Sequence, residues 1–223
     1  MTPSRGRLAP RPRSAPAGAP HGPGVHALTA SGRRDGLLVV PPERSGPLPL
    51  LVFFHGAGGD AARSLPVVQE LAVARGLLVL LPTSTAPTWD LLMGGIGPDV
   101  LALDAALAEV FDRWAVERVA LGGFSDGASY ALSLGLANGD LADAVLAFSP
   151  GFAAPPAQVG RPGVWVSHGT ADAVLPVDRC GRRVVRRLGE AGYQVRYEEF
   201  DGPHVVPPVL AAQAVDWWLA GPA

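Results

Sequence analysis

Three side chains with the chemistry of a nucleophile, an acid and a base lie in the second half of the sequence. Ser125 is the centre of a Gly-Phe-Ser-Asp-Gly pentapeptide, Asp172 ends a His-Gly-Thr-Ala-Asp run, and His204 ends a Gly-Pro-His turn. A serine hydroxyl is a weak nucleophile at neutral pH unless a base takes its proton and a further group fixes the tautomer of that base. The sequence therefore predicts Ser125 as nucleophile, His204 as base and Asp172 as the orienting acid.

The pentapeptide around Ser125 has the G-x-S-x-G pattern of a nucleophile elbow. An apolar run beginning at Val119 precedes it, and small residues typical of a helix start follow it. Glycine suits Gly123 and Gly127 because a side chain there would collide with neighbouring backbone. Five residues of this kind also occur in ordinary strand-to-helix loops. The assignment of Ser125 as a nucleophile therefore depends on finding a matching acid and base elsewhere in the chain.

The rival histidines and acids fit structural roles. His168 ends a predicted buried strand, and His55 precedes a glycine-rich turn that it would brace. Asp201 lies three residues before His204 and is the alternative acid, although its position suits a turn. The order Ser125, Asp172, His204 favours Asp172.

A tetrahedral intermediate needs two N–H donors directed at its oxygen. We expect one from Asp126, directly after the nucleophile, and one from Ala57 in the His-Gly-Ala-Gly turn that begins at His55. The same small residues would also serve a tight strand-to-helix connection. Substrate contacts are expected from loop residues that could instead pack in the core, namely Trp89, Met93, Phe124, Phe152 and Val174.

The composition limits the class of protein. The chain has 223 residues, of which 48% are hydrophobic and 17% charged, and its net charge is −2. This length suits one α/β domain, and the charge gives no reason to expect nucleic acid or a membrane surface as partner. Cys180 is the single cysteine, and no Cys/His cluster has zinc-site spacing. We expect no metal and no cofactor.

Residues 1–24 are rich in Pro, Arg, Ala and Gly. They contain no apolar run of the kind a secretory signal needs, so a cytoplasmic location is the expectation. The composition predicts a disordered leader, with a basic tail for an anionic partner as the alternative. Residues 25–223 then form the folded domain.

Strands and helices alternate through that domain. The predicted strands cover about 25–30, 36–40, 48–54, 77–81, 119–123, 144–148, 163–167 and 195–200. The predicted helices cover about 61–75, 99–114, 126–137, 177–191 and 208–219. This order favours a mostly parallel sheet with helices on both faces, and the candidate site residues all follow strands, so they can meet at one edge of the sheet. Residues 149–162 are too few for a lid domain.

Two surface features have open interpretations. Arg182, Arg183, Arg186 and Arg187 crowd one side of the predicted helix 177–191, which is either a solvated face or an anion site. Trp217 and Trp218 either anchor the last helix to the sheet or form a homodimer contact.

Taken together, these motifs resemble the α/β-hydrolase superfamily, in particular compact carboxylesterase/phospholipase enzymes and dienelactone-hydrolase-like esterases. The resemblance rests on the runs that begin at His55, Gly123, His168 and Gly202, which occur in the family's order. It implies a Ser-His-Asp triad that hydrolyses esters through an acyl-enzyme. Ala57 replaces a larger apolar residue of related thioesterases, so their acyl preference does not carry over.

The sequence leaves three hypotheses. The first is a serine esterase acting on small to medium carboxylic esters. The second keeps the triad but uses thioesters, lactones, lysophospholipids or short peptides. The third is a non-enzymatic binding protein on a hydrolase scaffold.

Overall fold

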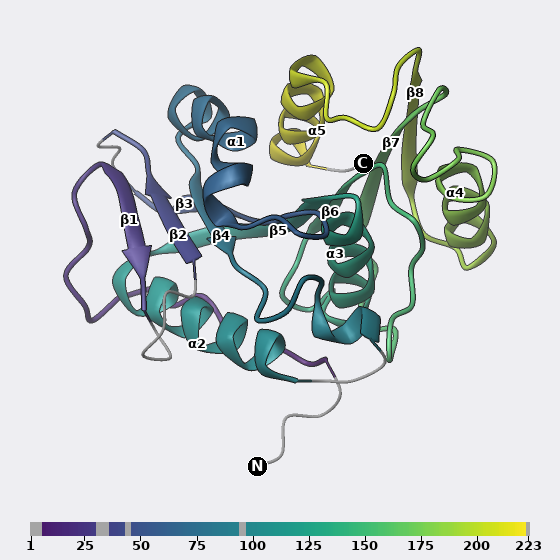
Figure 1. Cartoon of the computed structure of the whole chain (residues 1–223). Helices are drawn as coiled ribbons and strands as arrows, with labels where there is room; N and C mark the ends of the chain where they lie inside the picture. The colour runs from purple at the N-terminus through teal and green to yellow at the C-terminus, as the bar shows by residue number, and fades with distance from the viewer. Residues whose placement is uncertain (1–5, 30–35, 43–45, 94–96, 222–223) are drawn as a thin grey trace.

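The computed structural model describes residues 6–29, 36–42, 46–93 and 97–221, apart from the side chain of Leu92. The segment between the strands predicted at 25–30 and 36–40 lies outside these residues. Within them, eight strands form one sheet in the order β1-β2-β4-β3-β5-β6-β7-β8 (Figure 1). The strands are β1 (Gly24–Leu28), β2 (Gly36–Val40), β3 (Leu48–Phe54), β4 (Leu78–Pro82), β5 (Val116–Phe124), β6 (Ala144–Phe148), β7 (Gly163–Gly169) and β8 (Val195–Phe200).

The pairings from β4 through β8 are parallel, whereas β1 and β2 are antiparallel to their neighbours. Helices cover both faces, which confirms the predicted α/β architecture. The helices are α1 (Ala61–Arg75), α2 (Pro98–Arg113), α3 (Asp126–Ala137), α4 (Gly181–Glu190) and α5 (Pro208–Ala220). In Figure 1, α1 and α5 lie on one side of the sheet and α2 and α3 on the other.

The alternation of side chains along a buried strand divides the core into two layers. Every residue of β3 is buried. Leu50 and Val52 belong to the layer shared with α2, α3 and α4, whereas Leu51 and Phe53 belong to the layer shared with α1 and α5. A strand with an apolar core on both faces must read as a continuous apolar run, which is why this strand was readable from the sequence.

Two helices differ from the prediction. Helix α4 begins at Gly181 rather than at 177, because the chain first makes a turn in which Arg179 N and Cys180 N both donate to Pro176 O. A short 3-10 helix, η1 (Asp90–Met93), lies between the strand predicted at 77–81 and the helix predicted at 99–114, where no element is predicted. Residues 149–162 contain no helix or strand, only an isolated bridge at Gly160, so this part of the chain holds no lid domain.

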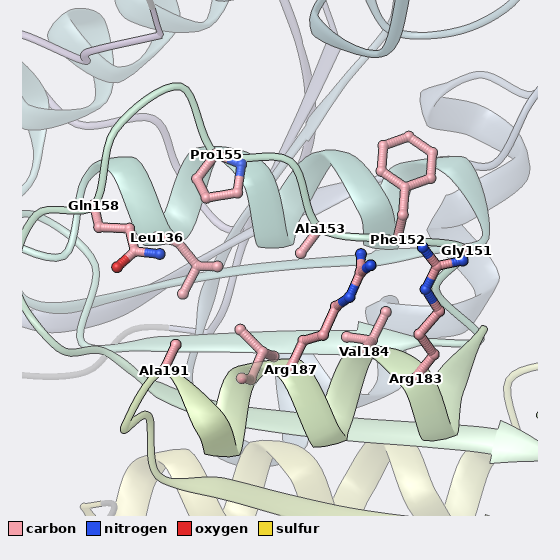
Figure 2. Close-up of a pocket in the computed structure, with 11 residues that line it drawn as sticks. Leu136, Gly151, Phe152, Ala153, Pro155, Gln158, Arg183, Val184, Arg187 and Ala191 are labelled. Carbon is pink, nitrogen blue, oxygen red and sulfur yellow. The ribbon is translucent and has the colours of Figure 1, made fainter. Parts of the chain in front are cut away.

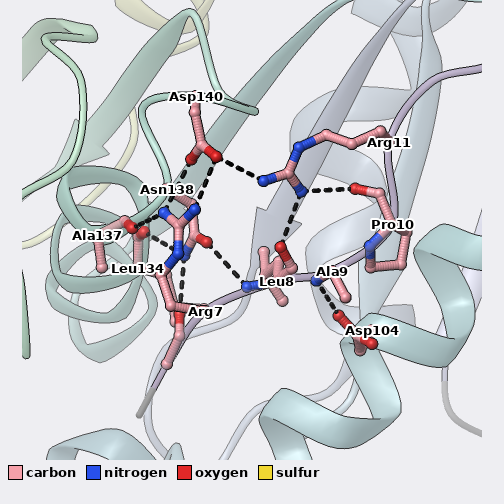
Figure 3. Close-up of polar contacts among 11 residues, drawn as sticks. Arg7, Leu8, Ala9, Pro10, Arg11, Asp104, Leu134, Ala137, Asn138 and Asp140 are labelled. Atoms are coloured by element: carbon pink, nitrogen blue, oxygen red, sulfur yellow. Dashed lines mark hydrogen bonds and ion pairs between the residues drawn. The ribbon is translucent and has the colours of Figure 1, made fainter. Parts of the chain in front are cut away.

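The N-terminal segment lies on the domain, in contrast to the disorder expected from its composition (Figure 3). Leu8 is 1% exposed and belongs to the core layer beneath α2 and α3. The buried side-chain amide of Asn138 binds the backbone of this segment at two points. It accepts from Leu8 N at 2.8 Å and donates to Gly6 O at 2.8 Å. Arg7 makes a two-pronged ion pair with Asp140.

Further contacts extend this attachment along α2. Ala9 N donates to Asp104, Arg13 pairs with Asp112, and Gly18 N donates to Asp112 O. Composition gives no sign of this arrangement because one apolar residue among Pro and Arg has no periodicity. The attachment depends instead on distant partners, chiefly the buried Asn138, whose side-chain oxygen has no donor other than Leu8 N among the described residues.

We predict that Leu8→Ala lowers the free energy of unfolding by about 2–4 kcal/mol, because it removes a buried side chain and leaves a cavity. Denaturant titration at neutral pH measures this. Arg13→Ala is the control: its ion pair is exposed, so the change should stay below about 1 kcal/mol. An equal effect of the two substitutions would contradict the packed position of Leu8.

Candidate active site

Ser125 occupies the turn between β5 and α3. Its backbone has φ 58° and ψ −120°, a conformation that non-glycine residues rarely adopt. A Cβ atom at Gly123 would overlap Gly127 O, and one at Gly127 would overlap Phe54 O. Glycine at both positions therefore allows the close approach that produces the sharp turn. Ser125 N donates to Phe148 O at 2.9 Å, which fixes the turn to β6.

The three residues predicted to act together are in hydrogen-bonding contact. His204 Nε2 lies 2.9 Å from Ser125 Oγ, and His204 Nδ1 lies 2.5 Å from Asp172 Oδ2. In the neutral ring with its proton on Nδ1, that N–H donates to Asp172 and the Ser125 hydroxyl donates to Nε2. The alternative acid, Asp201, is exposed, and the bond from the ring goes to Asp172.

Asp172 is 5% exposed and is held as a carboxylate by donors from its own loop. Its Oδ1 accepts from Val174 N at 2.9 Å and from Leu175 N at 2.8 Å. Burial raises the pKa of Asp172, but the Leu175 N–H, the His204 ring and the Val174 N–H together outweigh it, so the pKa lies below its ordinary value.

His168 supports the same loop from beneath. It is fully buried, and its Nε2–H donates to Leu175 O at 2.7 Å while lying 3.2 Å from Asp172 Oδ2. The sequence suggested a structural role for this residue but did not indicate its contact with the acid. The four-residue spacing from His168 to Asp172 across a strand end was the available signal.

The turn that follows β3 lies directly against the nucleophile. A Cβ atom on Gly56 would be 3.3 Å from Ser125 Cβ. His55 braces this turn: its Nδ1–H donates to Gly56 O at 2.7 Å, and its Nε2 accepts from Ser84 N at 3.0 Å. Burial lowers the pKa of His55, which favours this neutral form.

Neither Ala57 N nor Asp126 N has a hydrogen-bond partner among the described residues. Both therefore stay available to an oxygen bound beside Ser125. The Asp126 side chain has a separate task, since Oδ2 accepts from Thr88 Oγ1 at 2.7 Å and so ties the segment after β4 to the start of α3.

A cleft of about 390 Å³ lies beside His204 and beside Phe124, the residue directly before Ser125. Its walls come from the turn after β3, the first part of α1, the start of the elbow and the loop after His204. They are formed by Phe53, His55, Gly56, Ala57, Gly59, Arg63, Ser64, Val67, Phe124, His204, Val205 and Val206. Among the described residues, no group of three or more His, Cys, Asp or Glu side chains is placed to hold a metal ion.

Comparison with known proteins gives the fold. No family model matches the chain, and no curated protein matches it. Solved structures do match: the esterase PE8 superposes with a TM-score of 0.66 at 22% identity, over 83% of this chain and 98% of that one. This chain has the α/β-hydrolase fold.

Two further matches span nearly the whole of their own chains. The fluorophosphonate-binding serine hydrolase FphF of Staphylococcus aureus has a TM-score of 0.66 at 14% identity, with 89% of this chain and 98% of that chain covered. Acyl-protein thioesterase 2 of Zea mays has a TM-score of 0.60 at 19% identity, with 83% and 98% covered. The α/β-hydrolase fold predicted from the motifs is confirmed.

The residues predicted to contact substrate have different positions in this fold. Trp89 is 1% exposed, stacks on Tyr130, and donates from Nε1 to His55 O at 2.9 Å. An aromatic residue in an irregular segment can fold back into the core, and Trp89 does so. It supports the turn after β3 instead of facing the cleft.

Phe124 is the one member of this set that lines the cleft, with its ring 4.6 Å from that of His204. Phe152 is 41% exposed and belongs to a different cavity, beside α4. Val174 and Met93 are 65% and 69% exposed, and neither lines the cleft.

No helix in the described part of the chain is long and apolar enough to cross a bilayer.

The low pKa of Asp172 predicts a pH-dependent contribution to stability. Because the pKa is lower in the folded chain than in the unfolded chain, this contribution is complete above the unfolded value of about 3.9 and is lost as pH falls through the folded value. The difference in unfolding free energy between wild type and Asp172→Asn should therefore shrink as pH falls from about 5 to 3.

Denaturant titrations across this pH range measure the difference. Asp201→Asn, at an exposed acid near His204 in sequence, is the control and should follow wild type. Parallel curves for wild type and Asp172→Asn would contradict the hydrogen bonding of the Asp172 carboxylate.

Proposed function

We propose that this protein is a serine hydrolase that cleaves small to medium carboxylic esters through an acyl-enzyme. The observation that carries the proposal is the continuous hydrogen-bonded chain from Ser125 Oγ through His204 to Asp172 Oδ2. A chain of this kind makes a hydroxyl nucleophilic without any other group. The non-enzymatic alternative would have no need for it.

In the first half of the reaction, Ser125 Oγ attacks the ester carbonyl carbon while His204 Nε2 takes the hydroxyl proton. The carbonyl oxygen becomes an oxyanion, and the N–H groups of Ala57 and Asp126 stabilise it. His204 then gives its proton to the departing alcohol oxygen. Asp172 stabilises the imidazolium that exists between these two proton transfers.

In the second half, water takes the place of the alcohol. His204 accepts a proton from the water, and the resulting hydroxide attacks the acyl carbon bonded to Ser125 Oγ. The same two N–H groups stabilise the second oxyanion, and the proton on Nε2 returns to Ser125 when the acid leaves. Every step uses side chains and N–H groups of this chain.

The cleft suggests a moderately apolar substrate. Phe53, Val67, Phe124, Val205 and Val206 supply apolar wall, and the opening is wide. Several matched structures are named as esterases. The thioesterase match keeps thioesters as the second candidate, because the same attack applies to a thioester carbonyl. Lactones, lysophospholipids and short peptides stay alternative substrates. The cytoplasmic location and the homodimer stay predictions.

We predict that Ser125→Ala lowers kcat for a p-nitrophenyl ester by roughly 10³-fold or more, since the attacking atom is lost. Steady-state hydrolysis of acetate, butyrate and octanoate esters measures it, and parallel thioester and anilide substrates define the class. Ser14→Ala, at an exposed serine in the N-terminal segment, should match wild type.

A fluorophosphonate probe gives a second readout. It should label wild type and Ser14→Ala at Ser125, with stoichiometry read by intact-protein mass spectrometry, and leave Ser125→Ala unmodified. Retention of wild-type hydrolysis by Ser125→Ala would refute the proposal. A wild-type chain that neither hydrolyses esters nor takes the label would support the binding-protein alternative instead.

A further inference from the structure

A second cavity, of about 180 Å³, lies between α4 and the loop after β6 (Figure 2). Its floor is apolar and includes Leu136, Val184 and Leu188. Phe152, Ala153 and Pro155 form the facing side on the loop. None of the residues of the triad or of the turn after β3 lines it, so it is separate from the cleft described above.

Two arginines project from α4 across the opening of this cavity. Figure 2 shows the Arg183 and Arg187 side chains extending from the helix toward Phe152 and Ala153. Because they are four residues apart, they lie on one side of the helix. No acidic residue lines the cavity, and no carboxylate among the described residues lies within ion-pair distance of either guanidinium.

The neighbouring arginines of the same helix are different. Arg182 pairs with Asp178 at 2.7 Å and with Glu199 at 2.6 Å, and Arg186 lies 3.9 Å from Glu190. The charges on one side of α4 are therefore compensated within the chain, whereas those at the cavity are not. A purely solvated arginine surface would not require an apolar cavity next to Arg183 and Arg187, so the cavity favours the anion-site interpretation.

The size of the cavity defines the apolar part of a ligand. An apolar cavity of about 150 Å³ is enough to hold benzene, so this cavity fits one ring or a short alkyl chain. Guanidinium groups pair with carboxylates through charge-assisted hydrogen bonds, often in a two-pronged arrangement. Apolar lining with a few placed polar groups is the usual form of a small-molecule site.

We infer that this cavity binds a small carboxylate with an apolar body about the size of a benzene ring, its anionic head held by Arg183 and Arg187. The inference does not depend on the proposed ester hydrolysis. It does place the ligand close to the elbow: Gly151, at one end of the cavity, donates from N to Ser129 Oγ at 3.0 Å, and Ser129 Oγ–H donates to Ser125 O.

The test is a 19F NMR titration of the full-length protein with 4-fluorophenylacetate. We expect saturable binding at millimolar or lower concentration, and weaker binding of the neutral analogue 2-(4-fluorophenyl)ethanol. Arg183→Gln combined with Arg187→Gln should weaken carboxylate binding by roughly tenfold or more, because both cationic partners are lost. Arg186→Gln, on the same helix but outside the cavity, should stay within about twofold of wild type.

Two further measurements locate the bound probe. Ala153→Phe fills the cavity from the loop and should abolish binding, with the circular dichroism spectrum showing that the variant is folded. Labelling Ser125 with a fluorophosphonate blocks the cleft and should leave the probe affinity unchanged. Absence of saturable binding, equal affinity for the double arginine variant, or loss of binding after labelling would each overturn the inference.

Discussion

The strained turn at Ser125 is the constraint on which the rest of the site depends. A positive φ at a serine costs on the order of 1–3 kcal/mol and persists only where the surroundings enforce it. Here the enforcement comes from α3, in which every residue from Gly127 to Ala137 is buried, and from the bond between Ser125 N and β6. The helix can lie this close to β3 and β5 only because Gly123 and Gly127 lack side chains.

Much of this arrangement could be predicted from the sequence because the central strands are buried on both faces. A strand such as β3 leaves one continuous apolar run, and polar residues directly after such runs must meet at one edge of a parallel sheet. Ser125, Asp172 and His204 follow β5, β7 and β8, and the structure brings their side chains together. What they do in catalysis is the proposal that this contact supports.

The features that could not be predicted from the sequence are the segments of irregular backbone that individual side chains hold in place. Trp89 could not be distinguished from a cleft residue because no periodicity operates between β4 and α2. Asp99 holds that segment by accepting from Thr85 N and Asp90 N, and Asp90 in turn accepts from Gly97 N. Burial and the nearby Asp99 raise the pKa of Asp90. Buried N–H groups without a ladder need such acceptors, but their pairing follows only from coordinates.

The attachment of the N-terminal segment also affects the order of events during synthesis. Leu8 and its partner Asn138 are 130 positions apart in the chain, so Leu8 leaves the ribosome well before its partner is synthesised. At translation rates of about 5–20 residues per second, that delay is on the order of ten seconds. Throughout that delay, the core layer beneath α2 and α3 that contains Leu8 is incomplete.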